Sequence, residues 1–267
     1  MFYDTHAHLD YPEFAQELPQ LIERAQSAGI TKIIGIGTDL ESSQRVIQLS
    51  REYPSVYAAV GWHPSEAARA PEDVRPGLRQ LAHDAKVVAI GEIGLDYHRL
   101  PSTKPEGTPA DDEACKRKQQ AVFRQQLDLA RELGLNCVVH QRDSFEDTLA
   151  LVQEFSQSVR TVFHCFSNPP ADAQRVLATR SLVSFTGILT FKNAQTVRDA
   201  LAATPLGQFM LETDCPFLAP VPYRGKRCEP SYAKYIAETA AQVKGISMEE
   251  LGRETSAAAE QFFRGLA

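Results

Sequence analysis

The chain has 267 residues, 43% of them hydrophobic and 23% charged, a composition that can bury a full core and excludes a disordered protein. Its formal net charge of −6 excludes a global basic field, so a nucleic-acid substrate would need a local basic patch or metal ions at the site. The five cysteines are odd in number and lack CxxC spacing, which excludes a disulfide framework and a zinc ribbon.

Short apolar or β-branched runs recur along the chain, and each is followed by a helical pattern. The first lies within MFYDTHAHLD, which has neither a basic region nor an apolar signal core, so we expect a cytoplasmic protein that does not enter a membrane. The eight predicted strands are Phe2–His6, Lys32–Gly37, Tyr57–Gly61, Val87–Glu92, Asn136–His140, Thr161–His164, Leu182–Thr186 and Phe209–Thr213.

Helical patterns fill the intervals between these strands and the end of the chain. The predicted helices include Pro12–Ala28, Glu41–Glu52, Glu113–Leu133, Ser144–Gln157, Pro230–Lys244 and Met248–Arg264. Strand–helix alternation implies parallel strands joined by crossover helices. Eight such units favour an α/β fold of the (β/α)8 TIM-barrel class, with residues 1–267 as a single domain. The sequence leaves the oligomeric state open, and a monomer is compatible with it.

Two proline-rich stretches follow predicted strands. His98–Asp112 comes after the fourth strand and is either the rim of an active site or an inserted linker. Pro216–Pro230 comes after the eighth strand. Because the active sites of barrel enzymes lie at this end of the strands, both stretches are candidates for the rim.

Polar residues stand at the C-terminal ends of the predicted strands. His6 and His8 face one side because alternate residues of a strand do, and both a shared metal and a hydrogen-bonded pair are compatible with them. The other strand-end residues are Glu92, His140, His164 and Asp214. Four imidazoles and two carboxylates buried at one barrel mouth would be costly without cations, so we predict a metal cluster there.

The remaining histidines are less informative. His63 follows the third strand and could line the pocket or cap a turn. His98 could reach a substrate or be exposed in its loop, and His83 is expected on the surface of a helix.

Nine stretches that span nearly the whole chain match one known family. They are DTHAHLD at 4–10, GWHP at 61–64, GEIGLDY at 91–97, FRQQLDLA at 123–130, VVHQRDS at 138–144, HCFS at 164–167, TGILTFKN at 186–193, LETDCPFLAP at 211–220 and EPSY at 229–232. With these stretches the chain resembles the TatD-type metal-dependent deoxyribonucleases of the amidohydrolase superfamily. The resemblance implies a TIM barrel, two divalent ions (Zn, Mg or Mn) and hydrolysis of phosphodiesters, as in 3′–5′ exonuclease action on transiently bound single-stranded DNA or RNA.

The resemblance also implies a role for each matching residue. The ligands of one metal would be His6, His8 and Asp214, those of the second would be His140 and His164, and Glu92 would bridge the two. Asp214 is placed to take a proton from the attacking water and, with Glu92, would be catalytic. Glu212 matches a position near the site, either as an outer-shell residue or in an ion pair with a neighbouring cation.

The chain departs from the family pattern in three places. Cys228 stands where Asn is expected, Ala258-Ala259-Glu260 occupies a region that usually carries an Asn, and residues 98–112 form a longer and more proline-rich stretch. None of these positions is a metal ligand, so the departures bear on the choice of substrate.

Substrate contacts and alternative functions stay open at this point. Arg142 could fork onto a phosphate, and the basic residues Lys192, Arg224, Lys226 and Arg227 could steer an anion or simply be solvated. The aromatic residues Trp62, Tyr97 and Phe166 could stack on bases or pack in the core. The alternatives to a nuclease are a hydrolase of a small amide, ester or phosphoester, and a non-enzymatic metal-binding protein, which would need no general base.

Overall fold

The strands of this computed structural model, which describes residues 1–103 and 105–266, form one sheet in the order β1 to β8. They are β1 (Phe2–Ala7), β2 (Ile30–Ile36), β3 (Val56–Val60), β4 (Val87–Asp96), β5 (Cys137–Arg142), β6 (Thr161–Phe163), β7 (Leu182–Phe185) and β8 (Phe209–Leu211). All seven neighbouring pairs are parallel. The α/β fold of the (β/α)8 TIM-barrel class predicted from the sequence is therefore confirmed.

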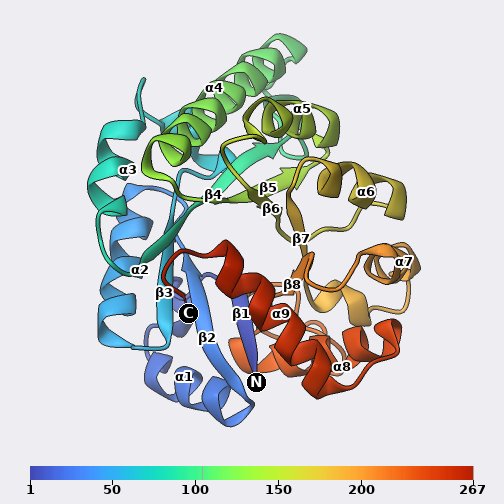
Figure 1. Ribbon diagram of the computed structural model, residues 1–267. Coiled ribbons are helices and arrows are strands. Elements are labelled where there is room, and N and C mark those ends of the chain that lie inside the picture. Colours follow the sequence, from blue (N-terminus) through green and yellow to red (C-terminus); the bar gives the residue numbers. More distant parts are fainter. Residues whose placement is uncertain (104, 267) are drawn as a thin grey trace.

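Helices follow the strands and surround the sheet (Figure 1). The α-helices are α1 (Leu18–Ser27), α2 (Leu40–Glu52), α3 (Arg75–Ala82), α4 (Pro109–Leu133), α5 (Phe145–Phe155), α6 (Pro170–Ala178), α7 (Gln195–Ala203), α8 (Ala233–Lys244) and α9 (Met248–Phe262). Short 3-10 helices are η1 (Pro12–Phe14), η2 (Pro64–Arg69), η3 (Pro101–Thr103), η4 (Gly187–Thr190) and η5 (Pro230–Tyr232). No helix among the described residues is both long and apolar enough to cross a bilayer.

The barrel closes where the first and last strands end. Ala7 and Cys215 form a single parallel bridge, and the backbone N–H of His8 donates to the carbonyl of Cys215 at 2.9 Å. The N–H of Asp214 donates to the carbonyl of His6, also at 2.9 Å. Backbone hydrogen bonds therefore bring the two histidines and the aspartate together from opposite ends of the chain.

The interior of the barrel is a separate apolar cluster from the larger one between the strands and the outer helices. Ile34, Val138, Val162 and Met210 belong to the interior cluster, together with Phe262 at the end of α9. Figure 1 shows α9 crossing the strands beside both chain termini, so this helix covers the N-terminal end of the barrel.

The interior residues also determine which side chains reach the opposite end. Alternate residues of a strand face the same side, so a residue two positions after an interior one points into the barrel mouth. Val138 is followed in this way by His140, and Val162 by His164. The polar residues at the mouth are thus the last layer of an otherwise apolar barrel interior.

Several predicted boundaries were wrong. The helix expected over Pro12–Ala28 is split into η1 and α1, and the one expected over Pro230–Lys244 into η5 and α8. The unpatterned stretch ends earlier than expected, because α4 begins at Pro109: the side chain of Thr108 accepts from the backbone N–H of Asp111, whose side chain bonds back. Residue 104 of this stretch lies outside the described residues.

Candidate metal centre

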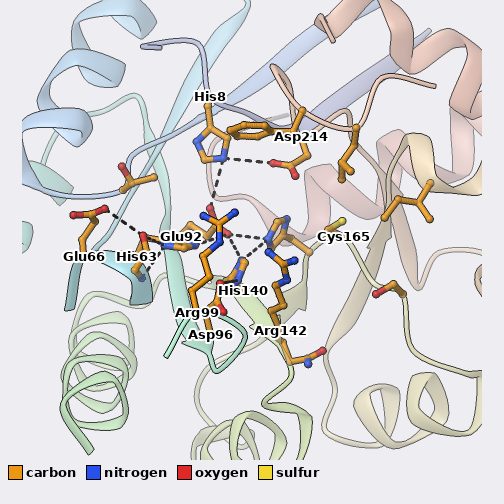
Figure 2. Close-up of a pocket in the computed structure, with 18 of the residues that line it drawn as sticks. His8, His63, Glu66, Glu92, Asp96, Arg99, His140, Arg142, Cys165 and Asp214 are labelled. Carbon is orange, nitrogen blue, oxygen red and sulfur yellow. Dashed lines mark hydrogen bonds and ion pairs between the residues drawn. The ribbon is translucent and has the colours of Figure 1, made fainter. Parts of the chain in front are cut away.

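The carboxylate of Glu92 lies between two groups of imidazoles (Figure 2). Its Oε2 is 3.4 Å from Nε2 of His6 and 3.7 Å from Nε2 of His8. Its Oε1 is 2.8 Å from both Nδ1 of His140 and Nε2 of His164. Only 2% of this side chain is exposed. One buried carboxylate therefore faces a different set of nitrogen donors with each of its oxygens.

The first donor set has the spacing of a tetrahedral metal site. The Nε2 atoms of His6 and His8 are 3.4 Å apart. Oδ1 of Asp214 lies 3.7 Å from the first of these nitrogens and 3.4 Å from the second. Ligands about 2.1 Å from a tetrahedral ion are about 3.4 Å from one another, so these atoms and Oε2 of Glu92 could surround one divalent ion.

The donor atoms of the second set lie closer to one another. Nδ1 of His140 lies 3.1 Å from Nε2 of His164, and both contact Oε1 of Glu92 directly. On the other side of the ring, Nε2 of His140 lies 3.3 Å from Oδ2 of Asp96. An ionised carboxylate only accepts, so it favours the proton on Nε2 and leaves the lone pair of Nδ1 free for a metal.

Sequence reasoning missed Asp96, although it lies four residues after Glu92 in the GEIGLDY stretch. The predicted strand ended at Glu92, whereas β4 continues to Asp96. The alternation of the longer strand would have placed both carboxylates on one face.

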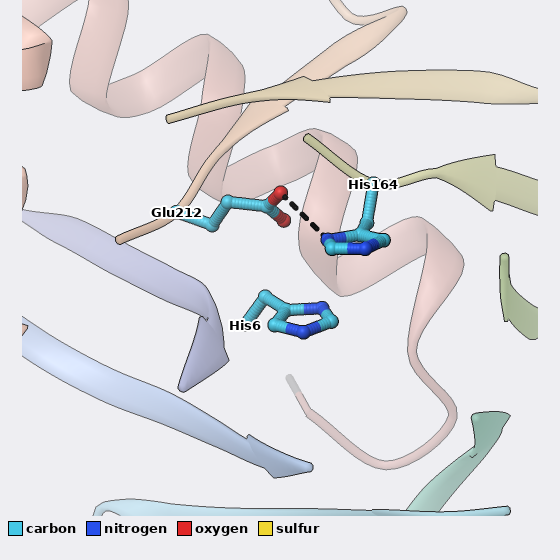
Figure 3. A group of neighbouring side chains, drawn as sticks. All are labelled: His6, His164 and Glu212. Carbon is cyan, nitrogen blue, oxygen red and sulfur yellow. Dashed lines mark ion pairs between the residues drawn. The ribbon is translucent and has the colours of Figure 1, made fainter. Parts of the chain in front are cut away.

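Glu212 lies beside the imidazole of His164, on the side of its Nδ1 atom (Figure 3). Its Oε1 accepts a hydrogen bond from the backbone N–H of Cys165 at 2.7 Å and lies 3.5 Å from Nδ1 of His164. The ring of His6 stacks on that of His164, with centroids 4.0 Å apart. Glu212 is therefore placed to orient His164 with Nε2 toward Glu92.

His63 both lines the pocket and caps a turn, so the two alternatives left open by the sequence are compatible. Its Nδ1 accepts from the backbone N–H of Ser65 at 3.1 Å, and its Nε2 lies 3.4 Å from Oε1 of Glu92. Because a backbone N–H can only donate, the neutral ring carries its proton on Nε2. His63 therefore presents a hydrogen-bond donor to the centre, unlike the imidazoles that can offer a lone pair.

The charges of this cluster depend on one another. Burial raises the pKa of Glu92, but the imidazoles of His164, His63 and His6 outweigh this effect and hold that pKa well below its usual range. Burial lowers the pKa of His164, yet the carboxylates of Glu92 and Glu212 raise it well above its ordinary value. The buried carboxylates are therefore stable only with positive charge beside them. Protons or metal ions could supply this charge, and both would compete for the same imidazole nitrogens.

The centre opens into a cavity of about 490 Å³ at the barrel mouth. Besides the residues of the centre, the lining of the cavity includes Tyr11, Glu66, Arg99, Arg142 and Phe217. Arg99 belongs to the stretch 98–112, so the beginning of this stretch forms part of the rim.

The other candidate contacts lie outside the described lining of this cavity. Arg224 packs over the ring of Phe191, 4.1 Å from its centroid, and Arg227 pairs with Glu17. His98 is exposed and pairs with Asp143 at 2.7 Å. His83 is exposed, as expected, but it caps the C-terminal end of α3 and does not lie within the helix, and Lys192 is also absent from the described lining.

The three aromatic residues that the sequence offered as possible base contacts interact with other parts of the chain instead. Trp62 is 8% exposed and donates to the carbonyl of Glu66, and Phe166 is 4% exposed within the core. Tyr97 donates to Asp147. The aromatic side chains at the cavity are instead Tyr11 and Phe217, which meet edge to face, and no local sequence pattern distinguished them.

Comparison with known proteins identifies one family for this chain. The family model described as TatD related DNase matches residues 3–264. The chain is 38% identical to the "uncharacterized metal-dependent hydrolase YabD" of Bacillus subtilis, over 99% of each protein. It is 31% identical to the "3′-5′ ssDNA/RNA exonuclease TatD" of Cronobacter sakazakii, over 98% of this chain and 97% of that one. Among solved structures, the Escherichia coli TatD homologue YJJV superposes with a TM-score of 0.89 at 28% identity, covering 98% of this chain and 97% of that one.

Proposed function

Because the chain belongs to the TatD-related DNase family of metal-dependent hydrolases, we propose that it is a two-metal phosphodiesterase that shortens single-stranded DNA or RNA from the 3′ end. The observation that carries this proposal is the position of Glu92, whose two oxygens face two separate sets of nitrogen donors. A relative covered along nearly its full length is named as an exonuclease with this polarity.

The proposed ligands follow from the geometry of the cluster. One ion would be held by His6, His8 and Asp214, the second by His140 and His164, and both by Glu92. Nitrogen-rich donor sets suit zinc or manganese, whereas phosphodiester chemistry often runs on magnesium. When bound, two such ions supply a lowered pKa for an attacking water and neutralise the phosphoryl oxygens.

The side chains of the centre would handle the protons of the reaction. Asp214 directs Oδ1 at the imidazoles of His6 and His8, while its Oδ2 has no hydrogen bond or ion pair with the described residues. This second oxygen could take the proton of the attacking water and return it to the leaving alkoxide. His63 could donate from Nε2 to a phosphoryl oxygen, because the Ser65 N–H holds the other ring nitrogen as an acceptor.

The direct test uses purified protein and single-stranded DNA and RNA carrying a label at either end, with Mg²⁺, Mn²⁺ or Zn²⁺. A 3′ label should be released first, and a 5′ label should give a ladder of shortening products. Asp214→Ala should abolish both results, whereas Asp199→Ala, which removes an exposed carboxylate on α7, should not.

Two other outcomes would replace the proposal. Intact oligonucleotides with every metal would exclude a nuclease, and turnover of amide or ester substrates under the same conditions would identify a different hydrolase of the same superfamily. The metal content of the purified protein, measured by mass spectrometry, tests the centre independently: two ions per chain are expected.

A further inference from the structure

Two arginines reach into the cavity from adjacent loops. Arg99 lies just after β4 and Arg142 ends β5, and both line the cavity. Figure 2 shows both side chains extending from the wall toward the region of Glu92 and His140. Both are solvent-exposed, so an incoming substrate can contact them.

The backbone holds the segments that carry these arginines together. The N–H of Tyr97 donates to the carbonyl of Arg142 at 2.8 Å. The residue before Arg99 is His98, and the residue after Arg142 is Asp143; these two side chains pair at 2.7 Å. Two separate contacts therefore place the arginines side by side on one edge of the cavity.

Neither guanidinium has a partner among the described residues. Within residues 1–103 and 105–266, no carboxylate lies within ion-pair distance of Arg99 or Arg142, and neither side chain donates a hydrogen bond to these residues. The nearby acidic residue Asp143 already pairs with His98. Glu66, which lines the same cavity, is already paired with Arg69. Two unpaired cations beside a metal centre form a site for an anion.

The charge of the loaded centre indicates that this anion is additional to the scissile phosphate. Two divalent ions carry four positive charges, which the carboxylates of Glu92, Asp96, Asp214 and Glu212 can balance, so the two guanidiniums are the positive charge in excess. A phosphodiester brings a single negative charge to the reaction. Of the two positive charges at Arg99 and Arg142, one is therefore left for a second group.

We propose that Arg99 and Arg142 bind the phosphate next to the scissile one, so that the preferred substrate of this chain carries at least two adjacent phosphates. This inference rests on the proposed nuclease function, since it assigns a second phosphate site to the same cavity. It distinguishes an oligonucleotide from a small diester, amide or ester, which would leave both guanidiniums without a partner.

The first test compares an oligonucleotide with bis(4-nitrophenyl) phosphate, a diester that has one phosphate. Loss of a hydrogen-bonded charge pair corresponds to about a 10- to 100-fold effect, so Arg99→Ala and Arg142→Ala should each lower kcat/KM for the oligonucleotide by about that factor. Turnover of the small diester should stay within about twofold of wild type. Equal losses on both substrates, or no loss on either, would overturn the second phosphate site.

The second test measures binding without hydrolysis. Fluorescence anisotropy of a labelled single-stranded oligonucleotide with Ca²⁺ in place of the working metal gives the dissociation constant over a range of salt concentrations. One neutralised phosphate contributes about −0.7 to the slope of log affinity against log salt, so each variant should flatten that slope by up to about this amount. Arg253→Ala, which removes an exposed arginine that lies against Glu254 on α9, serves as the control and should leave the slope unchanged.

These measurements separate the two proposals. Wild-type protein that binds the oligonucleotide with the expected salt slope but never cuts it would refute the nuclease function and retain the anion site. Cutting that proceeds with unchanged salt slopes in both variants would retain the nuclease and overturn the anion site.

Discussion

Asp96 should decide which nitrogen of His140 can bind a metal ion. Its Oδ2 lies 3.3 Å from Nε2 of that ring, and its Oδ1 accepts from the backbone N–H of His98 at 2.9 Å. Burial raises the pKa of Asp96, but the hydrogen bond from His140 outweighs this effect and lowers that pKa to about 2. The carboxylate is therefore ionised at neutral pH and holds the imidazole proton on Nε2.

Asp96→Asn keeps the size of the side chain but not its two acceptors. If the amide oxygen stays on the N–H of His98, the amide NH₂ faces Nε2 of His140 and pushes the imidazole proton onto Nδ1, the atom needed as a ligand. If the amide flips, its NH₂ opposes the N–H of His98. Once Nδ1 binds the ion and the imidazole proton sits on Nε2, either arrangement opposes two donors and leaves a group without its hydrogen bond, which costs about 1–3 kcal/mol. One ion should therefore bind about 5- to 150-fold more weakly.

The assay is a competition titration of the metal-free protein against a chromogenic chelator at neutral pH. Wild type should show two sites, and Asp96→Asn should weaken one of them. Asp143→Asn is the matched control: this exposed residue pairs with His98, does not contact His140, and has φ 53°, a conformation that Asn tolerates. Tight binding of both ions by Asp96→Asn would refute the tautomer argument.

Three further variants test the bridge, the backbone and the pH dependence of stability. Glu92→Gln should retain at most one ion per chain, counted by mass spectrometry, because the amide has one acceptor oxygen for two donor sets; two retained ions would exclude a bridge. Gly94→Ala should lose at least about 2 kcal/mol of unfolding free energy in urea, since φ is +135° and the new Cβ would lie 2.0 Å from the carbonyl oxygen of His140. Glu229 accepts from Nη2 of Arg24 at 2.6 Å; burial opposes this ionised pair, but the hydrogen bonds lower the pKa of the carboxyl. The stabilisation by this ion pair is therefore complete above the ordinary carboxyl pKa and is lost as pH falls through the folded pKa. The difference in unfolding free energy between wild type and Glu229→Gln, measured in urea, should shrink on acidification. A growing difference would contradict this pairing.

The local pattern of the sequence was sufficient for the barrel and for most of the centre. Apolar runs with a period of two predict strands, and the polar residues that end them are forced to the mouth by the same alternation. His140 and His164 could be recognised in this way because each stands two residues after an interior side chain. The hydrophobic pattern predicted the boundaries of elements less well: the single helix expected over Pro12–Ala28 consists of η1 and α1.

Other features depend on partners that are distant in the chain. Asp96 was missed because β4 continues past Glu92 only where it pairs with β5. The sequence left Arg224 open as an anion contact or a solvated side chain, but it packs over Phe191, while the guanidiniums at the cavity are those of Arg99 and Arg142.

The sequence by itself therefore determined the strand order, the parallel barrel and the chemical types that meet at its mouth. Only the tertiary structure decided that the two oxygens of Glu92 face different donor sets and that Asp96 supports His140. The physical reason is that periodicity records which face of a strand a side chain occupies, whereas contacts of 3 to 4 Å between side chains depend on how separate strands and loops approach one another.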